Sequence, residues 1–268
     1  MSIIHITKEN DEYQILMALK NNRDKRNKFH EVFIEGIEAF KQALAGKVQL
    51  TRIIIYNYNG LSDWARKVID ENKNVRLVEM NFEMYKALCD REEPVELLAT
   101  VKKQDFTLES LTLPEKPFVL MFDRPSDYGN FGSIVRSADA FGVDAVFVIG
   151  HGIDWYDPKA IRASLGAVFR KPIVQIQSND ELDSWMKKMR DLNGMEILGT
   201  DSTGETSVAE YKIKRPLSII LGNEAKGMSV ALKTMCDKIV SIPMCGEVNS
   251  LNVACACTVF LWEAFKNK

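Results

Sequence analysis

Cysteine is scarce in this sequence, and the few cysteines have no spacing of a recognised kind. The chain has five of them, an odd number, and no two stand in a CxxC pair. Both facts argue against a disulfide framework and against a zinc site, so we expect no metal. Two of the five, Cys255 and Cys257, fall in an apolar C-terminal stretch. We interpret the cysteines as small buried apolar residues.

Long hydrophobic runs are also missing. No stretch approaches the length of a membrane span, and the N-terminal MSIIHITKENDEYQ lacks both the basic start and the apolar core of a secretory signal. We therefore expect a cytoplasmic protein without a membrane partner. Of the 268 residues, 46% are hydrophobic and 27% are charged, which suits a globular protein of one large or two modest domains.

An excess of positive charge is the third absence. The net charge is -2 and the isoelectric point is near 6.0, whereas nucleic-acid-binding domains are commonly basic overall. Residues 20–30, KNNRDKRNKFH, are the local exception, because Asp24 alone opposes their basic side chains. These basic residues are Lys20, Arg23, Lys25, Arg26 and Lys28. Such a cluster can contact phosphates, although most charge runs are simply solvated surface.

Common nucleotide-binding and catalytic patterns are incomplete. Gly222 and Gly227 have the glycine spacing of a P-loop, but Met228 stands where the phosphate-binding lysine should be. Gly129 and Gly132 fall short of a GxGxxG, and the next strand ends VFVIG, without an acidic residue for a ribose. The three histidines are far apart in sequence and have no triad or metal spacing. These gaps argue against a kinase-type site and against a nicotinamide dehydrogenase.

Alternating strand-like and helix-like runs divide the chain into two α/β units. Strand-like runs at 32–34, 52–56, 75–80 and 97–101 alternate with helix-like runs at 36–44, 63–70 and 83–89. This pattern predicts a small α/β domain. Residues 102–116 have weak periodicity and a proline near their end. We therefore predict domains at residues 1–104 and 117–268, joined by a linker at 105–116.

The second unit has the stronger periodicity. Strand-like runs at 117–122, 145–150, 172–176, 195–199, 217–222 and 238–243 are separated by helices, two of them at about 132–141 and 180–192. Asp157 and Pro158 suit the start of a third helix, Ser178 and Glu181 have capping-box spacing, and Gly194 can end the helix that follows. Continuous apolar strands between helices are typical of a parallel sheet covered on both faces.

Three glycine-bearing polar loops follow apolar strands in this unit. They lie in DRPSDYGNFGSIVRSADAFG at 123–142, LGNEAKGM at 221–228 and IPMCGEVNSLNVACA at 242–256. Loops at the carboxyl ends of parallel strands expose backbone groups without disturbing the core, so ligands bind there. We expect the three loops to converge on one pocket. The apolar helix that follows, from about residue 250 to 265, could be entirely core or could form a subunit contact.

The same segments resemble the three motifs of the SpoU (TrmH-like) RNA 2′-O-ribose methyltransferases. NFGSIVR at 130–136, LGNEAKG at 221–227 and IPMCGEVNSLN at 242–252 come in the family's order. The N-terminal unit, with RDKRNKF at 23–29 and FIEG at 33–36, is similar to the smaller RNA-binding domain that many members carry ahead of the catalytic one. The resemblance makes the basic cluster a candidate phosphate contact. Its expected RNA-binding residues are Arg23, Lys25, Arg26 and Lys28.

The resemblance implies a C-terminal parallel-sheet α/β domain with a deep trefoil knot (SPOUT type), preceded by a smaller α/β RNA-binding domain. Periodicity alone predicts a plain doubly wound sheet, because knots are rare exceptions to unthreaded connections. Family members bind S-adenosylmethionine in the knot and work as homodimers. The glycines of the two knot loops allow close backbone approach, and their apolar residues can flank an adenine. The expected cofactor-binding residues are Leu221, Gly222, Asn223, Gly227, Ile242, Met244 and Leu251.

The implied reaction is attack of a ribose hydroxyl on the methyl group of a sulfonium. The protein must orient the hydroxyl and stabilise negative charge on its oxygen. Arg136 matches an arginine that has been proposed in the family as the base, but a guanidinium loses its proton only at very high pH, so we favour an electrostatic role. The other matching polar residues, expected to orient the ribose, the loops or Arg136, are Asn130, Glu224, Ser250 and Asn252. Their alternative role is to cap their own loops.

The leading hypothesis is therefore an S-adenosylmethionine-dependent RNA 2′-O-methyltransferase. Ribosomal RNA is favoured over transfer RNA as the substrate because of the N-terminal domain. One alternative is a non-catalytic RNA-binding or assembly protein that keeps the fold, although such a protein has no reason to keep all five polar motif residues. A weaker alternative is a small-molecule methyltransferase, for which the N-terminal domain would not be needed.

Overall fold

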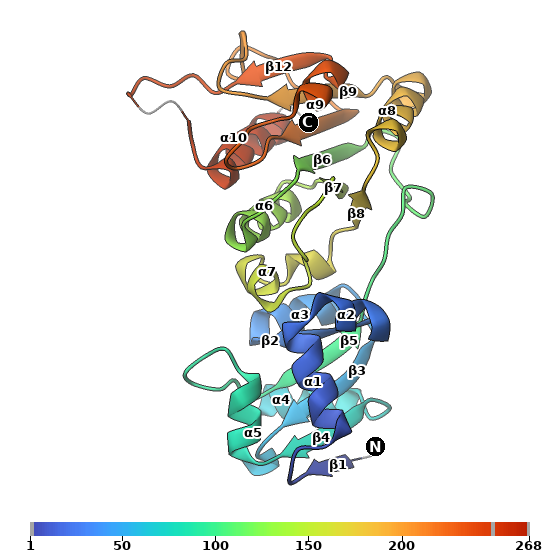
Figure 1. The fold of residues 1–268 in the computed structure, drawn as a ribbon, viewed down its shortest axis with the longest axis vertical. Coiled ribbons are helices and arrows are strands. Elements are labelled where there is room, and N and C mark those ends of the chain that lie inside the picture. Colours follow the sequence, from blue (N-terminus) through green and yellow to red (C-terminus); the bar gives the residue numbers. More distant parts are fainter. Residues whose placement is uncertain (1–2, 248–249, 267–268) are drawn as a thin grey trace. The chain divides into compact units, whose positions relative to one another are not determined.

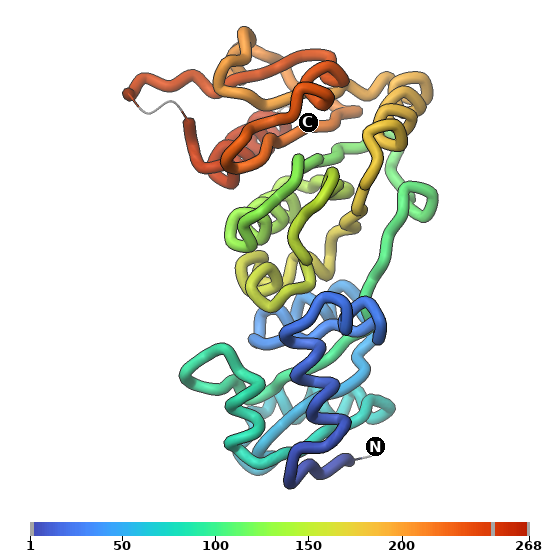
Figure 2. The backbone as a smooth tube through the Cα atoms, in the orientation of Figure 1, coloured from blue at the N-terminus to red at the C-terminus, as the bar shows by residue number. Residues whose placement is uncertain are grey.

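The computed structural model describes residues 3–247 and 250–266, and the chain forms two compact units. The first unit is Met1–Gln104 with Tyr156–Arg170, and the second is Asp105–Trp155 with Lys171–Lys268. Figure 1 labels their helices and strands, and Figure 2 traces the backbone. The predicted contiguous domains differ from these units in the segment 156–170. Among the described residues, none of the helices is both long and apolar enough to span a membrane.

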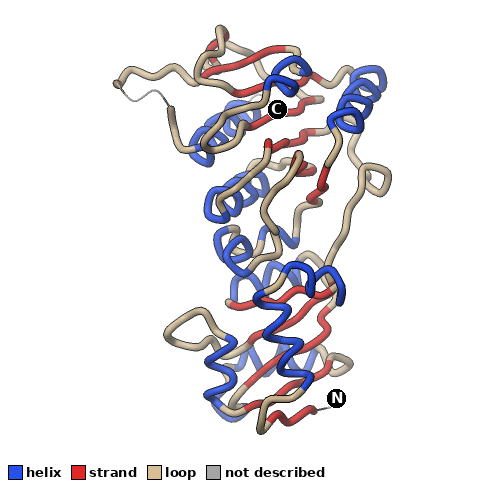
Figure 3. The backbone as a smooth tube through the Cα atoms, viewed as in Figure 1, coloured by secondary structure: helices blue, strands red, loops and turns tan. Residues whose placement is uncertain are grey.

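The first unit is built on a five-stranded mixed sheet (Figure 3). Its strands are β1 (Ile3–Ile6), β2 (Glu31–Glu35), β3 (Leu50–Ile55), β4 (Arg76–Met80) and β5 (Leu98–Lys102), in the order β1-β4-β3-β5-β2. β5 is antiparallel to both β2 and β3, and the other pairs are parallel. Its helices are α1 (Asp11–Asn21), α2 (Arg23–Phe29), α3 (Ile37–Ala45), α4 (Asp63–Glu71), α5 (Phe82–Leu88) and α7 (Pro158–Ala163), with 3-10 turns η1 (Tyr58–Gly60) and η2 (Ala167–Phe169). The small α/β domain predicted for this half is confirmed.

Residues 156–170 are held within the first unit by ion pairs and by close packing. Asp90 lies 2.8 Å from Lys20 and 2.7 Å from Arg162, which α7 supplies. α7 packs on β2, and η2 packs on α3. A Cβ atom on Gly166 would stand 2.7 Å from the Cα of Ala39, so the two backbones are in direct contact. The segment therefore completes the first unit although it lies in the second half of the sequence.

The second unit is built on a seven-stranded sheet. Its strands are β6 (Phe118–Asp123), β7 (Ala145–Ile149), β8 (Ile173–Ile176), β9 (Glu196–Thr200), β10 (Thr206–Ser207), β11 (Leu217–Leu221) and β12 (Lys238–Ser241), in the order β10-β12-β9-β11-β6-β7-β8. Each neighbouring pair in that order is parallel. Its helices are α6 (Tyr128–Ala140), α8 (Asn179–Asn193), α9 (Val230–Met235) and α10 (Val253–Lys266).

Helices cover both faces of this sheet. On β6, Met121 belongs to the same core cluster as Trp185 of α8 and Leu232 of α9. The next residue, Phe122, stacks on Phe131 of α6 with ring centroids 6.4 Å apart. Because successive side chains of a strand point to opposite faces, α6 lies opposite α8 and α9, and α10 packs beside α6. All residues of β6, β7 and β11 are buried, so the predicted parallel sheet covered on both faces is confirmed.

The residues predicted to begin and end helices do so. Asp157 is the N-cap of α7, with Pro158 as its first residue, and Ser178 caps α8 by accepting from the backbone N–H groups of Asp180 and Glu181. Gly194 ends α8 in the left-handed conformation, at a φ of 70°. These three helix ends were thus readable from the side chains alone.

Some elements were not predicted. No strand or helix was predicted before residue 31, where the structure has β1, α1 and α2. α1 does carry the usual signals, with Asn10 capping the N–H of Tyr13 and with Leu16 and Leu19 buried. β10 and α9 are two and six residues long, too short for periodicity to detect.

The segment predicted as a linker packs on the second unit. Phe106 forms an isolated bridge with Val174 of β8. Leu108, Leu111 and Leu113 lie against the core cluster that α8 helps to form. Residues 105–116 are therefore an ordered strap along this unit rather than a loose connection, because their leucines have apolar surface to cover.

Candidate functional site

A cavity of about 480 Å³ lies where the strands of the second sheet reach their carboxyl ends, and we term it the carboxyl-edge cavity. Its walls come from the segments after β9, β11 and β12 and from the first turns of α6 and α10. The lining residues that belong to the three predicted loops include Asn130, Gly222, Asn223, Glu224, Gly227, Ile242, Met244, Ser250, Leu251 and Asn252. The three loops thus meet at one pocket. Val248 and Asn249 of the same predicted loop lie outside the described residues.

The segment after β11 is closed on itself by hydrogen bonds. Asn223 and Gly227 exchange both backbone hydrogen bonds, at 3.1 and 2.9 Å. The Asn223 side-chain oxygen also accepts from the N–H groups of Ala225 and Lys226, at 3.1 and 3.0 Å. Gly227 has a φ of +66°, where a side chain would be strained. The loop therefore has one defined shape, and the cavity floor at Gly222 depends on it.

Glu224 joins this loop to the segment that begins α6. Its carboxylate accepts from the N–H of Ser126 at 3.2 Å, from the Ser126 hydroxyl at 2.9 Å and from the N–H of Asp127 at 3.1 Å. Beside it, the Asn223 amide donates to the carbonyl of Arg124 at 2.7 Å. The alternative that Glu224 only caps its own loop is therefore wrong, because its partners lie nearly a hundred residues earlier.

Asn130 and Asn252 join the first and third loops. The Asn252 amide donates to the Asn130 side-chain oxygen at 2.9 Å, and the Asn252 oxygen accepts from the N–H of Ala254 at the start of α10. Asn130 was predicted in a loop with the helix beginning near residue 132. In the structure α6 already begins at Tyr128, because the Asp127 carboxylate caps it by accepting from the Asn130 N–H at 2.7 Å. All three loops are therefore linked through side chains of their motif residues.

The cavity has a fourth wall that the sequence analysis missed. Thr200, Asp201 and Ser202, which follow β9, also line it. Partial burial raises the pKa of Asp201, but hydrogen bonds from Lys233 and Thr203 outweigh burial and lower this pKa to about 2. The Lys233 ammonium lies 2.6 Å from the carboxylate. Asp201 is therefore a fixed negative charge at the cavity, and the signal that could have found it is another polar loop, TDSTG, directly after a strand.

Apolar side chains form the opposite part of the cavity. Ile242 and Val253 are half-buried and Phe260 is buried, while Met244 and Leu251 are exposed by 38% and 45%. An apolar surface beside backbone polar groups and carboxylates is typical of sites for a ligand with a flat ring and a cationic or hydroxyl-bearing part. Volumes of roughly 300–1,000 Å³ are usual for such ligands.

Two residues predicted for the site do not line it. Leu221 is the last residue of β11 and is 1% exposed, so its side chain lies in the core and its cofactor contact stays a prediction. Arg136 lies in the middle of α6, is exposed and is not part of the cavity wall. Within residues 3–247 and 250–266 the side chain of Arg136 forms no hydrogen bond or ion pair, and its guanidinium is available to a ligand outside the fold.

The predicted RNA-binding residues separate into two kinds. Arg26 is 2% exposed, and its guanidinium donates to the carbonyls of Leu19 and Lys20 at 2.7 and 2.8 Å. It also lies 3.6 Å from Asp157. The prediction for Arg26 is therefore corrected to a structural role, since it holds the turn between α1 and α2. The remaining predicted residues, Arg23, Lys25 and Lys28, are exposed on α2.

Charge reversal on α2 should separate these roles. We expect Lys25→Glu with Lys28→Glu to weaken RNA binding and to flatten its salt dependence by about one unit of slope for each phosphate that is no longer neutralised. Arg26→Gln should instead lower the free energy of unfolding by about 1–3 kcal/mol, because buried carbonyls lose their donor. Binding titrations at several salt concentrations and urea unfolding measure the two effects. The control is Lys86→Glu, because Lys86 is an exposed residue of α5.

The arrangement is suited to holding a ligand in a defined pose. Its polar motif residues use much of their hydrogen-bonding capacity on one another, which fixes the loops. Ser250 and Lys226 remain exposed among the lining residues and are accessible to a second reactant. Preorganised loops of this kind raise reaction rates by positioning.

Known families and structures match both units. Residues 117–262 match the SpoU rRNA Methylase family, and residues 10–99 match the SpoU L30e-like domain. The chain is 34% identical over 265 residues to the 23S rRNA (uridine(2479)-2′-O)-methyltransferase of Streptomyces viridochromogenes, covering 98% of this chain and 92% of that protein.

Solved structures give the same result. The SpoU methyltransferase AviRb from Streptomyces viridochromogenes, in complex with the cofactor AdoMet, superposes with a TM-score of 0.89 at 34% identity, covering 96% of this chain and 98% of that one. An RNA 2′-O ribose methyltransferase superposes with a TM-score of 0.82 at 28% identity, covering 98% and 99%.

Proposed function

Since this chain belongs to the SpoU rRNA methylase family, we propose that it transfers a methyl group from S-adenosylmethionine to a ribose 2′-hydroxyl of ribosomal RNA. The observation that carries the proposal is the meeting of the three motif loops around the carboxyl-edge cavity. One relative that matches nearly the whole chain is a 23S ribosomal RNA 2′-O-methyltransferase. We therefore favour 23S ribosomal RNA over transfer RNA as the substrate.

The residues of the cavity fit the cofactor. S-adenosylmethionine would supply an electrophilic methyl group on a sulfonium. Ile242, Met244 and Leu251 offer apolar surface for its adenine, and the backbone at Gly222 lines the same cavity. The Asp201 carboxylate, which stays ionised because its pKa is lowered to about 2, is suited to a ribose hydroxyl or an ammonium of the cofactor. This fit supports the predicted cofactor residues other than Leu221.

Arg136 is the residue to which we assign stabilisation of the reacting oxygen. A guanidinium keeps its charge at all accessible pH values, so Arg136 holds the developing alkoxide or a neighbouring phosphate rather than removing a proton. Asn130, Glu224 and Asn252 position the loops around the reaction through the hydrogen bonds that join them. We assign Ser250, which is exposed at the rim of the cavity, to contact with the ribose.

Transfer of a labelled methyl group tests this function. Purified enzyme, labelled S-adenosylmethionine and separated 23S and transfer RNA from a host that lacks the gene should give label in 23S RNA. The label should appear in alkali-resistant dinucleotides, because a methylated 2′-oxygen cannot assist cleavage. Label on a base, label only in transfer RNA, or cofactor binding without any transfer to RNA would each overturn the proposal, and the last outcome would favour the binding-protein alternative.

The family also leads us to propose a trefoil knot in the second unit. The segment after β12 lines the same cavity as the segment after β11, and α10 then returns to pack on α6. Threading of the last segment through an earlier loop would hold these loops together. An enzyme that acts on ribosomal RNA meets its substrate where ribosomes are made, and we propose the cytoplasm as its location.

We propose that the enzyme is a homodimer that buries the exposed end of α10. Trp262 and Phe265 are large apolar side chains near the end of α10, and they are 49% and 37% exposed. Both contact Phe141 at the end of α6, with ring centroids 6.1 and 5.8 Å apart. Exposed aromatic clusters of this kind are typical of protein interfaces. Because α6 also carries Arg136, dimer formation and catalysis would share one pair of helices.

Replacing the tryptophan should dissociate the dimer. Trp262→Asp places a charge in the proposed interface, and we expect sedimentation velocity to show monomer at concentrations where the wild type is dimeric. Val230→Asp is the matched control, because Val230 is 78% exposed on α9 and away from this cluster. A wild-type chain that sediments as monomer at micromolar concentrations would contradict the proposed dimer.

A further inference from the structure

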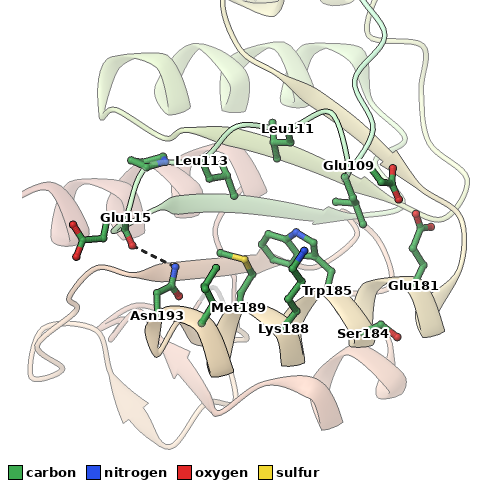
Figure 4. Close-up of a pocket in the computed structure, with 13 residues that line it drawn as sticks. Glu109, Leu111, Leu113, Glu115, Glu181, Ser184, Trp185, Lys188, Met189 and Asn193 are labelled. Carbon is green, nitrogen blue, oxygen red and sulfur yellow. Dashed lines mark hydrogen bonds between the residues drawn. The ribbon is translucent and has the colours of Figure 1, made fainter.

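A second cavity, of about 660 Å³, lies in the second unit between residues 108–115 and one side of α8, and we term it the strap groove. Figure 4 shows the two walls facing each other, with the strap above and α8 below. None of the predicted site residues lies in it. The groove therefore needs an explanation separate from the proposed methyl transfer.

The floor of the strap groove is apolar and preformed. Leu111 and Leu113 point from the strap toward Trp185 and Met189 of α8 (Figure 4). Trp185 and Met189 belong to the core cluster and are 8% and 6% exposed, so they cannot move away without disturbing the sheet. The start of the strap is fixed by a tight turn in which Thr107 and Ser110 exchange hydrogen bonds between side chains and backbone N–H groups. A ligand would meet a ready-made surface.

The ends of the groove are acidic. Glu109 and Glu181 lie at one end and Glu115 at the other, with the apolar residues between them (Figure 4). Lys188 is the one basic residue among the described residues that line the groove. The pKa of Glu109 is lowered chiefly by a hydrogen bond from its own backbone N–H and then by one from Thr107, which keeps the carboxylate ionised. These carboxylates repel RNA phosphates and attract cations.

One further feature shows that the groove is not a finished surface. Leu192, on the last turn of α8, is 71% exposed although it borders an apolar floor. Next to it, Asn193 donates to the carbonyl of Glu115 at 3.3 Å and ties this end of α8 to the strap. An exposed leucine beside an apolar floor is what the apolar side of a partner would cover.

We propose that the strap groove docks an amphipathic helix of a partner protein, with apolar residues on one side and basic residues near both ends. Glu181 and Asn193 are twelve residues apart on α8, which corresponds to about 18 Å along the axis. About three turns of a helix cover that length, so its leucine-sized residues would recur every three to four positions between the basic ends. Because the walls are a helix and an irregular strap, there is no free strand edge to which an extended peptide could add.

A labelled synthetic peptide tests the proposal on the full-length protein. The probe is a helix-favouring peptide of about fourteen residues with lysines at both ends and leucines at helical spacing between them. Its binding to the protein is measured by fluorescence anisotropy. We expect saturable binding that weakens as salt is raised. The same peptide with glutamates in place of the lysines should not bind. Absence of saturable binding up to millimolar protein, or equal binding of the acidic peptide, would overturn the proposal.

Variants of exposed groove residues identify the site. Glu109→Lys with Glu181→Lys should raise the dissociation constant of the peptide about 10-fold or more. Leu192→Asp should raise it to a similar degree. Glu210→Lys, also exposed in the second unit but outside the groove, is the matched control. Methyl transfer to 23S RNA should be unchanged in all three. Thermal unfolding should show all three folded at the assay temperature, with a slightly lower midpoint for the variant that reverses the charge of Glu181 in the first turn of α8. Peptide binding that survives the groove variants, or groove variants that change RNA binding instead, would show that the groove is not a protein docking site.

Discussion

An Arg136→Ala enzyme is expected to lose about two to three orders of magnitude in turnover while binding S-adenosylmethionine almost as tightly as the wild type. The reason lies in where the side chain stands. Arg136 is exposed on α6 and lies outside the wall of the carboxyl-edge cavity, so its loss leaves the cofactor contacts in place. A preorganised donor to a developing oxyanion contributes about 3–4 kcal/mol to the transition state.

The measurement is single-turnover transfer of a labelled methyl group to 23S RNA, together with a cofactor titration. Arg136→Lys keeps a positive charge without the planar fork of donors, and we expect it to recover only part of the rate. Ser133→Ala, an exposed position on the same helix, is the control and should be unaffected. An Arg136→Ala enzyme close to the wild-type rate, or one that has lost cofactor binding, would show that Arg136 does not stabilise the reacting oxygen.

The order of elements in the second unit could be read from the sequence because each local signal agrees with the fold. β6, β7 and β11 are buried on both faces, and only a parallel sheet between two helix layers needs such uninterrupted apolar runs. Asp157 and Gly194 mark helix ends through backbone geometry that few other residues satisfy. Local chemistry of this kind needs no knowledge of the rest of the chain.

The assignment of residues 156–170 could not be read in this way. The segment follows β7 in sequence, yet Arg162 pairs with Asp90 and Gly166 touches Ala39 of the first unit. Such contacts join residues more than seventy positions apart, and periodicity carries no information about them. Deletion of residues 1–104 would remove the rest of the first unit. Ile161 and Phe169, now 1% and 2% exposed, would then lose the residues they pack against. Inactivity of that truncation would therefore not establish that the first unit binds substrate.

The site shows the same division. Family motifs marked the three loops, and the cavity contains them. The motifs did not mark Asp201, because the carboxyl end of β9 became a wall only through its place beside β11. Leu221 lay inside a motif and is nevertheless buried, because it is the last residue of β11 and every residue of that strand is buried. Glu224 lines the cavity, but its partners Ser126 and Asp127 could be known only from the structure.

Gly222→Ala is expected to weaken S-adenosylmethionine binding by about 10- to 100-fold. A Cβ atom at position 222 would lie 2.6 Å from the carbonyl carbon of Gly227 and closer still to the nitrogen of Met228. Both are backbone atoms, so they cannot move aside as a flexible side chain would. The loop held by Asn223 must shift instead, and overpacking of this kind costs about 1–3 kcal/mol.

Gly227→Ala is the comparison for Gly222→Ala. We expect it to strain the loop without displacing it. A Cβ atom there meets nothing within 4 Å, but the φ of +66° is unfavourable for alanine. We therefore expect Gly227→Ala to lower the free energy of unfolding by about 1–2 kcal/mol and to change the cofactor dissociation constant only a few-fold. Calorimetric titration with S-adenosylmethionine and urea unfolding of both variants distinguish the two outcomes. Equal cofactor affinity in Gly222→Ala and wild type would mean that the cofactor does not depend on this loop, and the carboxyl-edge cavity would lose its proposed ligand.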